Sequence, residues 1–355
     1  MQPIQEFEGS HELTHRQKLV AALVLLATFQ GLILCAGFVA PYGFAIQDRE
    51  RPFSAPTPLH FRDAEGKFHL RPFVCALDDS EQSTGACKTD AENSYAVHFL
   101  VRGAPYKIGG LVPTHVHLFG VEPPAHIFLM GTDAYGRDQF SRFLFGGQIS
   151  MLAGLIATIL SLSVGILVGG VAGYYGGWVD ELLMRGGELF LALPWLYLLF
   201  AVRAALPLHI SQWEVFLMLV SVMGLIGWVR PARLIRGVVL SAKQRNFVVA
   251  ARGFGASDTY LLRRHILPQT YGVLLTQMTL LIPQYVLAEV TLTFLGLGVG
   301  EPLPSWGTLL ASLQQYYVLS SYWWMFLPAL FLIPLFLVFY TVADALQELH
   351  KTVSL

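Results

Sequence analysis

Charged residues are scarce in this sequence, and long stretches lack them altogether. Asp, Glu, Lys and Arg make up 13% of the 355 residues, whereas hydrophobic residues make up 54%. A soluble domain usually carries about a quarter charged residues. Four stretches hold none: 19–47, 143–179, 265–288 and 302–343. Because uncharged apolar runs of about 18 residues or more are typical of transmembrane helices, the composition indicates a polytopic membrane protein. It argues against a soluble enzyme, a disordered chain and a nucleic-acid binder.

Cysteine is rare as well, with three in the chain. Cys75 and Cys87 lie in segment 41–130, which differs from the rest in its mixed charges, its prolines and a strand-like patch at 95–101. We expect a small, mostly β, extracytoplasmic domain here. An oxidising compartment permits a disulfide between these two cysteines, with two unpaired thiols as the alternative. Cys35, in the first apolar run, is expected to be a small packing residue.

The apolar runs predict an all-α polytopic membrane protein with six transmembrane helices and the β insertion between helices 1 and 2. The second run is rich in Gly, Ala, Ser and Thr, which allows helix backbones to approach closely and predicts a helix inside a bundle. A cleaved signal peptide is the alternative for the first run, but the run is too long and further spans follow it. The predicted spans are 19–40, 147–172, 189–207, 212–229, 270–294 and 322–343.

The distribution of Lys and Arg predicts the orientation. With the N-terminus inside, the inner segments hold twelve of these residues and the short outer loops hold only Arg203. Basic residues concentrate in short cytoplasmic loops, so both termini are predicted to be cytoplasmic. The resulting division is a cytoplasmic N-terminus (1–18), helix 1 (19–40), an extracytoplasmic segment (41–142), a five-helix core (143–348) and a cytoplasmic C-terminus (349–355).

The inner loop 230–268 holds eight basic residues and one acid, Asp258. Apolar residues between Gln244 and Phe254 recur at helical spacing, on what we predict to be one face: Phe247, Val248, Ala250, Ala251 and Phe254. Gly255 then supplies the positive φ of a sharp helix end, and Ser257 can cap a second short helix. The prediction is a helix–turn–helix across the inner face. By periodicity alone, an interfacial helix on anionic lipid is an equal alternative.

Val248–Asp258 is followed by His265–Pro268, and five further segments carry motifs: Gly131–Asp138, Gly173–Asp180 with Met184-Arg185, Leu193-Pro194, Leu287–Gly298 and Pro304–Gly307. In this order, these segments resemble bacterial ABC-importer permease subunits of the dipeptide/oligopeptide/nickel branch, and among their two permease types the "C" partner. The first of them is similar to the family's EAA…G…I–LP signature, with Val249 in place of the glutamate. Segment 41–130 is longer than expected for the family.

The resemblance implies a permease that forms half of a translocation path for peptides or similar small solutes. It implies four kinds of partner: a second permease subunit, two ABC ATPase subunits, an extracytoplasmic solute-binding protein and membrane lipid. ATP and Mg are expected on the ATPase subunits, and none is expected on this chain, which lacks a G-x-x-x-x-G-K-[ST] phosphate loop. The expected ATPase-coupling residues are Ala250, Ala251, Arg252, Gly255, Ala256, Ser257, Asp258, Leu267 and Pro268. The implied location is the bacterial inner membrane.

Two smaller features leave alternatives open. Glu289 is an acid inside the predicted fifth span, where ionisable residues are functional candidates. It either lines the route or pairs structurally with Arg203, and the pairing is the preferred interpretation. His115, His117 and His126 lack further ligands at suitable spacing, so we expect no metal site. We also expect no catalytic residue, because no nucleophile, base and orienting group are expected within reach of one another.

Two other function classes compete with the importer. A secondary transporter or channel would show inverted repeats with matched broken helices, and the sequence has no convincing self-similarity. An intramembrane hydrolase would need paired acids or a Ser/His pair at one depth within the spans, whereas the histidines lie in loops. Both therefore remain alternatives of lower rank.

Overall fold

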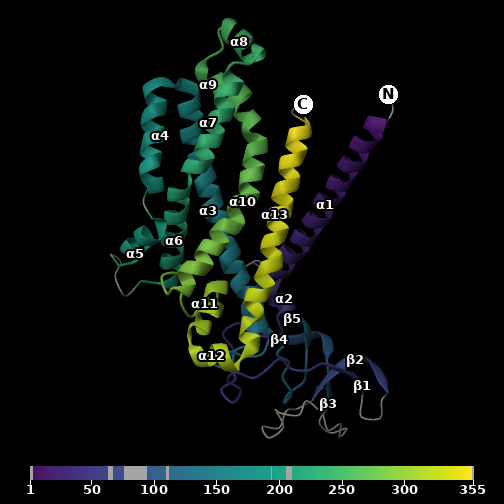
Figure 1. Cartoon of the computed structure of the whole chain (residues 1–355). Coiled ribbons are helices and arrows are strands. Elements are labelled where there is room, and N and C mark those ends of the chain that lie inside the picture. Colours follow the sequence, from purple (N-terminus) through teal and green to yellow (C-terminus); the bar gives the residue numbers. More distant parts are fainter. Residues whose placement is uncertain are drawn as a thin grey trace. The chain divides into compact units, whose positions relative to one another are not determined.

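The computed structural model describes residues 3–62, 67–75, 94–108, 112–192, 194–204 and 210–353. The chain divides into two compact units (Figure 1). Unit 1 contains residues 1–27, 150–299 and 334–355, and unit 2 contains residues 28–149 and 300–333. Three long helices run from one unit into the other: α1 (Pro3–Leu34), α3 (Gln139–Tyr175) and α13 (Leu327–Val353).

Five helical segments among the described residues are long and apolar enough to cross a membrane. The first two are Gln17–Leu34 within α1 and the whole of α3. The third, Gln212–Lys243, joins α6 (Gln212–Gly227) to α7 (Val229–Lys243). The fourth, Asp258–Phe294, contains α9 (Asp258–Leu261) and α10 (Tyr271–Phe294), and the fifth is Trp323–Glu348. The chain is thus a mostly helical, polytopic membrane protein.

The predicted third span, 189–207, is not a continuous helix among the described residues. It is divided between α4 (Gly177–Ala192) and α5 (Trp195–Ala204), of 16 and 10 residues. Pro194 stands between them and its carbonyl accepts the backbone N–H of Leu198. Proline has no N–H to continue a preceding helix, so Pro194 does not extend α4 and stands directly before the first residue of α5.

Small residues of α3 bring helix backbones into contact in unit 1, as the composition of this segment predicted. A Cβ on Gly169 would lie 2.3 Å from the carbonyl oxygen of Ala232, and one on Gly173 would lie 2.9 Å from that of Arg236. Both partners are on α7. On the same helix, a Cβ on Gly154 would lie 2.9 Å from the carbonyl oxygen of Ile282, on α10. Such close approach replaces hydrophobic driving force inside a membrane.

Unit 2 contains five strands among its described residues. Strands β1 (His60–Arg62), β2 (Phe68–Cys75) and β3 (Ser94–Ala96) form an antiparallel sheet in that order. Strands β4 (His98–Ile108) and β5 (Val112–Gly120) form an antiparallel pair. Between them Val97 is buried with Val74, Ala125 and Ile127. The short helices α2 (Ala36–Val39), α11 (Trp306–Ala311) and α12 (Tyr316–Ser321) complete the unit.

The cysteines and histidines of unit 2 have defined environments. Cys75 is disulfide-bonded and Cys35 is an exposed free thiol, while Cys87 lies outside the described residues. Nδ1 of His117 lies 2.6 Å from the carbonyl oxygen of Ala40, and its Nε2 lies 2.9 Å from that of Ala104. Both ring nitrogens are therefore engaged by the backbone. Within the described ranges, no three His, Cys, Asp or Glu residues are grouped so as to hold a metal ion.

Candidate functional site

The predicted helix–turn–helix is present as α8 (Asn246–Gly253), a turn, and α9. Gly255 has φ +84°, and the N–H of Ala256 donates to the carbonyl of Ala251 at 3.1 Å, which closes the end of α8 as in a Schellman motif. The hydroxyl of Ser257 accepts the N–H of Tyr260 at the start of α9. The positive φ of Gly255 and these two hydrogen bonds bend the chain sharply between two short helices. The roles predicted for Gly255 and Ser257 in this bend are confirmed.

One face of this bent helix pair, residues 246–261, is buried. Val248 and Leu261 lie in a core with Ile235, Val239 and Ala242 of α7, and Ala251 and Ala256 pack against the same core. Because this core is made by α7, the pair is a continuation of the helical bundle and not a free loop.

The other face is apolar but exposed, which corrects the prediction of a single apolar face. Phe254 is 93% exposed, and Phe247, Val249 and Ala250 are also exposed. Residues three and four apart share a helix face, so Val248 and Ala251 turn inward while Phe247, Ala250 and Phe254 turn outward together. The pair therefore carries an unburied apolar stripe at the end of unit 1 where α8 lies (Figure 1).

Tyr174, near the end of α3, ties the bent helix pair to the bundle. Its hydroxyl donates to a carboxylate oxygen of Asp258 and accepts from Nη2 of Arg252 at 2.8 Å. Lys243 donates to the carbonyl of Tyr174. The ammonium of Lys243 and the guanidinium of Arg252 lie 5.3 and 5.7 Å from the centre of the Tyr174 ring, within range of cation–π attraction.

Sequence reasoning assigned no role to Tyr174, although it stands in one of the family-like segments. Its two contacts join distant parts of the chain, since Arg252 lies 78 positions and Asp258 84 positions from Tyr174. A local sequence pattern cannot predict a contact between residues so far apart. The indication that the sequence did contain was the resemblance of the segment around Tyr174 to the family.

Leu267 and Pro268 lie where the bent helix pair joins α10. The backbone passes through a π turn (Leu262–Ile266) and a 3₁₀ turn (Leu267–Thr270) in which Pro268 occupies a starting position. Leu267 is half-buried, and a Cβ on Gly170 of α3 would be 3.4 Å from it. Both residues thus stand at the exit of the pair, where the sequence placed them.

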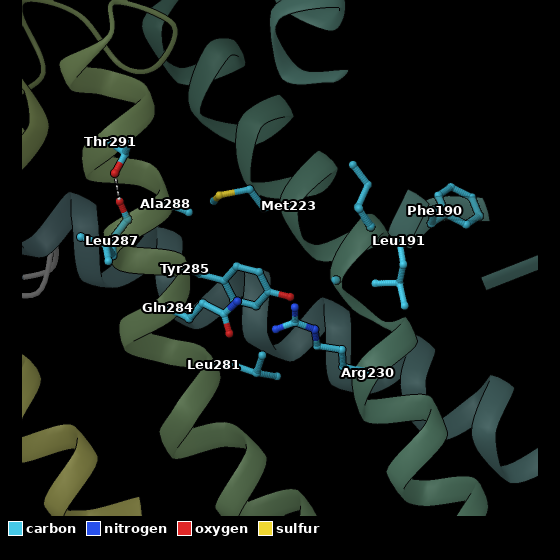
Figure 2. Close-up of a pocket in the computed structure, with 12 residues that line it drawn as sticks. Phe190, Leu191, Met223, Arg230, Leu281, Gln284, Tyr285, Leu287, Ala288 and Thr291 are labelled. Atoms are coloured by element: carbon cyan, nitrogen blue, oxygen red, sulfur yellow. Dashed lines mark hydrogen bonds between the residues drawn. The ribbon is translucent and has the colours of Figure 1, made fainter. Parts of the chain in front are cut away.

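A cavity of about 370 Å³ opens between α4, α6, α7 and α10 in unit 1 (Figure 2). Its apolar wall is formed mainly by Phe190, Leu191, Met223, Ile226, Leu281 and Leu287. Its polar groups are the guanidinium of Arg230, the amide of Gln284 and the hydroxyls of Tyr285 and Thr291. Arg230 was expected in the loop after the fourth span, but it lies on α7 within the third candidate span of the structure.

Glu289 is not among the residues that line this cavity. It is fully buried in α10, and its carboxylate accepts the hydroxyl of Thr293 at 2.8 Å. That hydroxyl in turn accepts the N–H of Val299 at 3.2 Å. The arrangement links the end of α10 to the following turn. The side chain of Arg203, the partner expected for Glu289, lies outside the described residues.

In unit 2, the family-like segment Gly131–Asp138 forms a capped turn. The side chain of Asp138 accepts the N–H and the hydroxyl of Ser141 at 2.9 and 2.6 Å, which caps the start of α3. Burial raises the pKa of Asp138 to about 6. Gly136 has φ +70°, and a Cβ there would lie 1.7 Å from the carbonyl oxygen of Asp48. Only glycine fits at this position.

Two arginines hold a carboxylate beside this turn. Arg137 donates to Asp133 at 2.7 Å and to Glu301 at 2.9 Å, and Arg142 donates to Glu301 at 2.8 Å. The two neighbouring guanidinium groups lower the pKa of Glu301, despite the opposing effect of its partial burial. The sequence assigned no role to Glu301, because its partners are more than 150 residues away.

Comparison with known proteins identifies the family. Residues 165–351, more than half of the chain, match the family described as "Binding-protein-dependent transport system inner membrane component". The chain belongs to this family. The matched region contains the bent helix pair, Tyr174 and the cavity. The chain is therefore a membrane component of a transport system and, as predicted, a permease.

Individual relatives agree with this assignment. The permease is 36% identical over 227 residues to the dipeptide transport system permease protein DppC of Bacillus subtilis (strain 168), covering 64% of this chain and 69% of the relative. The oligopeptide transport system permease protein OppC of the same strain is 35% identical, over 64% of this chain and 72% of the relative. OppC of Haemophilus influenzae (strain ATCC 51907 / DSM 11121 / KW20 / Rd) is 34% identical, over 63% and 69%. The resemblance inferred from the motifs is confirmed.

Proposed function

We propose that this permease forms half of the translocation path of an ATP-driven importer of peptides. The relatives named above are dipeptide and oligopeptide permeases, and they match this chain over about two thirds of their length. The other half of the path is a second permease subunit. The importer also contains two ABC ATPase subunits, which bind ATP and Mg, and a solute-binding protein. This chain binds no cofactor of its own.

The bent helix pair is the coupling element in this proposal, and its exposed apolar stripe is the observation that carries it. Phe254 is 93% exposed at the tip of a structure that is anchored on its other face. An exposed aromatic on a rigid support is suited to fill a pocket on a partner protein. Closure of the ATPases would push this pair and, through Tyr174 and α7, tilt the bundle between two packings.

The nine coupling residues predicted from the sequence have different parts in this mechanism. Ala250 and the turn at Gly255 contact the ATPase, whereas Ala251 and Ala256 pack on the bundle. Ser257 shapes the bend. Arg252 and Asp258 hold the pair to Tyr174, and Leu267 with Pro268 sets the angle of the exit. The roles differ because only some of these side chains are exposed.

The proposed topology has six spans with both termini cytoplasmic. Within unit 1, the start of α1, the end of α13 and α8 lie at the same end (Figure 1). This is the end that carries the excess of basic residues. Residues 177–204 of α4 and α5 would extend about 40 Å as helix, so together they are long enough for a crossing in two parts. Segment 41–142, with its strands, then lies outside the cell and receives the solute-binding protein.

Substitution of the exposed tip tests the coupling role. The permease is co-expressed with its partner permease and ATPases, purified, and assayed for ATP hydrolysis and peptide uptake in proteoliposomes. We expect Phe254→Asp to reduce co-purification of the ATPases and uptake at least about tenfold, because burial of an unpaired carboxylate in an apolar pocket is costly. The side chain is exposed, so the permease itself should remain folded.

Val249→Glu is the matched control. Val249 is 58% exposed on the same short helix, and the signature that this segment resembles has a glutamate there. We expect this variant to assemble and to transport like the wild type. If Phe254→Asp and Val249→Glu are both fully active, the pair does not dock the ATPase and is a membrane-surface element.

A further inference from the structure

The cavity of unit 1 contains a positive charge that stands within a candidate membrane span. Arg230 is the one charged side chain among the 12 residues that line it, and no carboxylate lines it. The residue lies near the middle of the 32-residue candidate span Gln212–Lys243. The carbonyl of the nearby Trp228 faces Gly165, well inside α3. Arg230 therefore lies along the length of the bundle and not at its end, with its side chain exposed at the cavity.

Two other arginines of α7 form ion pairs and do not line this cavity. Arg233 donates to Glu188 at 3.0 Å, and Arg236 donates to both carboxylate oxygens of Asp180. Among the described residues, the side chain of Arg230 makes no hydrogen bond and no ion pair, and its charge acts on the nearby Tyr285. Figure 2 shows its guanidinium directed into the cavity beside the ring of Tyr285. A charge in a membrane span is costly unless it is compensated, so a compensating anion is expected in the cavity.

The packing around Arg230 keeps this space open and shaped. Tyr285 is buried, and a Cβ on Gly227 would lie 1.7 Å from its hydroxyl oxygen, so the glycine makes room for the phenol. Gln284, one position along α10, is exposed at the cavity. The volume of about 370 Å³ lies within the usual range for sites that hold small molecules.

We infer that this cavity is a subsite for the C-terminal carboxylate of the transported peptide, with Arg230 as its recognition residue. This inference rests on the proposed peptide function and deepens it. A guanidinium matches a carboxylate with two parallel hydrogen bonds. The apolar wall accommodates the last side chain of the peptide, and Gln284 offers both a donor and an acceptor to its last amide. No acid lines the cavity, so the peptide's ammonium group is not the group held here.

The test compares a peptide acid with its amide. The complete importer, with its partner permease, ATPases and solute-binding protein, is reconstituted in proteoliposomes. The probes are labelled trileucine and trileucine amide. Affinities of the solute-binding protein for both are measured separately, and uptake is measured with that protein saturated. This removes the receptor's own preference from the comparison.

Arg230→Met should lower the maximal uptake rate of trileucine about tenfold or more, because one charge-assisted pairing is lost, and change that of the amide by less than about twofold. Arg230→Lys should give an intermediate acid-to-amide ratio, since lysine keeps the charge but not the fork geometry. Arg233→Met is the matched control, one turn away and outside the cavity, and should leave the ratio unchanged.

The other sources of an anion predict a different result. If Arg230 pairs with a lipid phosphate or with a carboxylate of the second permease, Arg230→Met will alter uptake of both probes equally, which overturns the inference. An unchanged ratio in both Arg230 variants overturns it as well. A wild-type importer that couples its ATPases but transports neither probe refutes the proposed peptide function instead.

Discussion

Asp138 is a carboxylic acid in an unusual position, since it is buried yet caps a long helix. Its side chain accepts two hydrogen bonds from Ser141, which favour the charged form, but burial outweighs them and raises its pKa to about 6. The pKa of Glu301 is shifted in the opposite direction. That carboxylate is partly exposed and faces two guanidinium groups, so its pKa is lowered. Desolvation dominates at one residue and charge pairing at the other.

The raised pKa of Asp138 predicts a pH-dependent stability. Between its ordinary pKa of 3.8 and about 6, the folded protein binds more protons at this residue than the unfolded protein does. The contribution of Asp138 therefore becomes more favourable as the pH falls through 6, by at most about 3 kcal/mol. Asp138→Asn mimics the protonated form and keeps an oxygen to cap the helix. We expect it to raise the melting temperature at pH 7.5 and to have little effect at pH 4.5.

The measurement is thermal unfolding in detergent, followed by tryptophan fluorescence at several pH values. The difference between wild type and Asp138→Asn isolates this residue from other titrating groups. His126, for example, has a pKa lowered mainly by burial, and its protonation destabilises the fold as the pH falls. A variant that is less stable than the wild type at pH 7.5 would show that the cap requires the charge.

Among the helices, α8 of the bent helix pair has one face that packs on the bundle and one face that stays exposed. Val248 and Ala251 attach it to α7, while Phe247, Ala250 and Phe254 remain outside. The apolar spacing could be recognised in the sequence, but the division of its residues between core and surface could not. It depends on where α7 lies, which is set by residues far away in the chain.

In our proposal Tyr174 transmits motion from the bent helix pair to the bundle, and removal of its hydroxyl tests this role. Tyr174→Phe keeps the ring but deletes the group that bridges Arg252 and Asp258. We expect the ATPases to remain bound and to hydrolyse ATP, while peptide uptake per ATP falls about threefold to tenfold. This corresponds to about 0.7–1.4 kcal/mol for the loss of the two hydrogen bonds together. The measurement is the ratio of uptake to hydrolysis in proteoliposomes.

Tyr175→Phe is the control for this prediction. Tyr175 is the next residue, is 60% exposed, and its ring contacts that of Tyr174 edge-on. Loss of its hydroxyl should leave the ratio of uptake to hydrolysis unchanged. Equal effects of the two substitutions, or none from either, would mean that the link through Tyr174 does not transmit motion.

At the scale of the whole molecule, the orientation in the membrane can be tested by thiol labelling. Cys35 is first replaced by Ala, because it is an exposed free thiol. Single cysteines are then introduced at Tyr316, which is 82% exposed in unit 2, and at Gly253, which is exposed in the bent helix pair. A membrane-impermeant maleimide should label Tyr316→Cys in intact spheroplasts and Gly253→Cys only after permeabilisation. The reverse pattern would invert the proposed topology.

Composition and short-range sequence patterns were enough to predict the membrane class, most of the apolar spans, the bend at Gly255 and Ser257, and the family. These features depend on composition and on residues within a few positions of each other, which local physical rules describe. The two-part α4–α5 segment was missed because the apolar run is continuous through Pro194, and hydropathy does not register a missing N–H.

The residues that act together could be identified only from the folded arrangement of distant segments. The contact of Tyr174 with Arg252 and Asp258, the two arginines on Glu301, and the cavity around Arg230 each join segments that are far apart in the chain. Arg230 looks from the sequence like one more loop arginine. In the structure it lies within a candidate membrane span instead, because α6 and α7 form one long helical segment. Its charge there faces a mostly apolar cavity that α4, α6, α7 and α10 line.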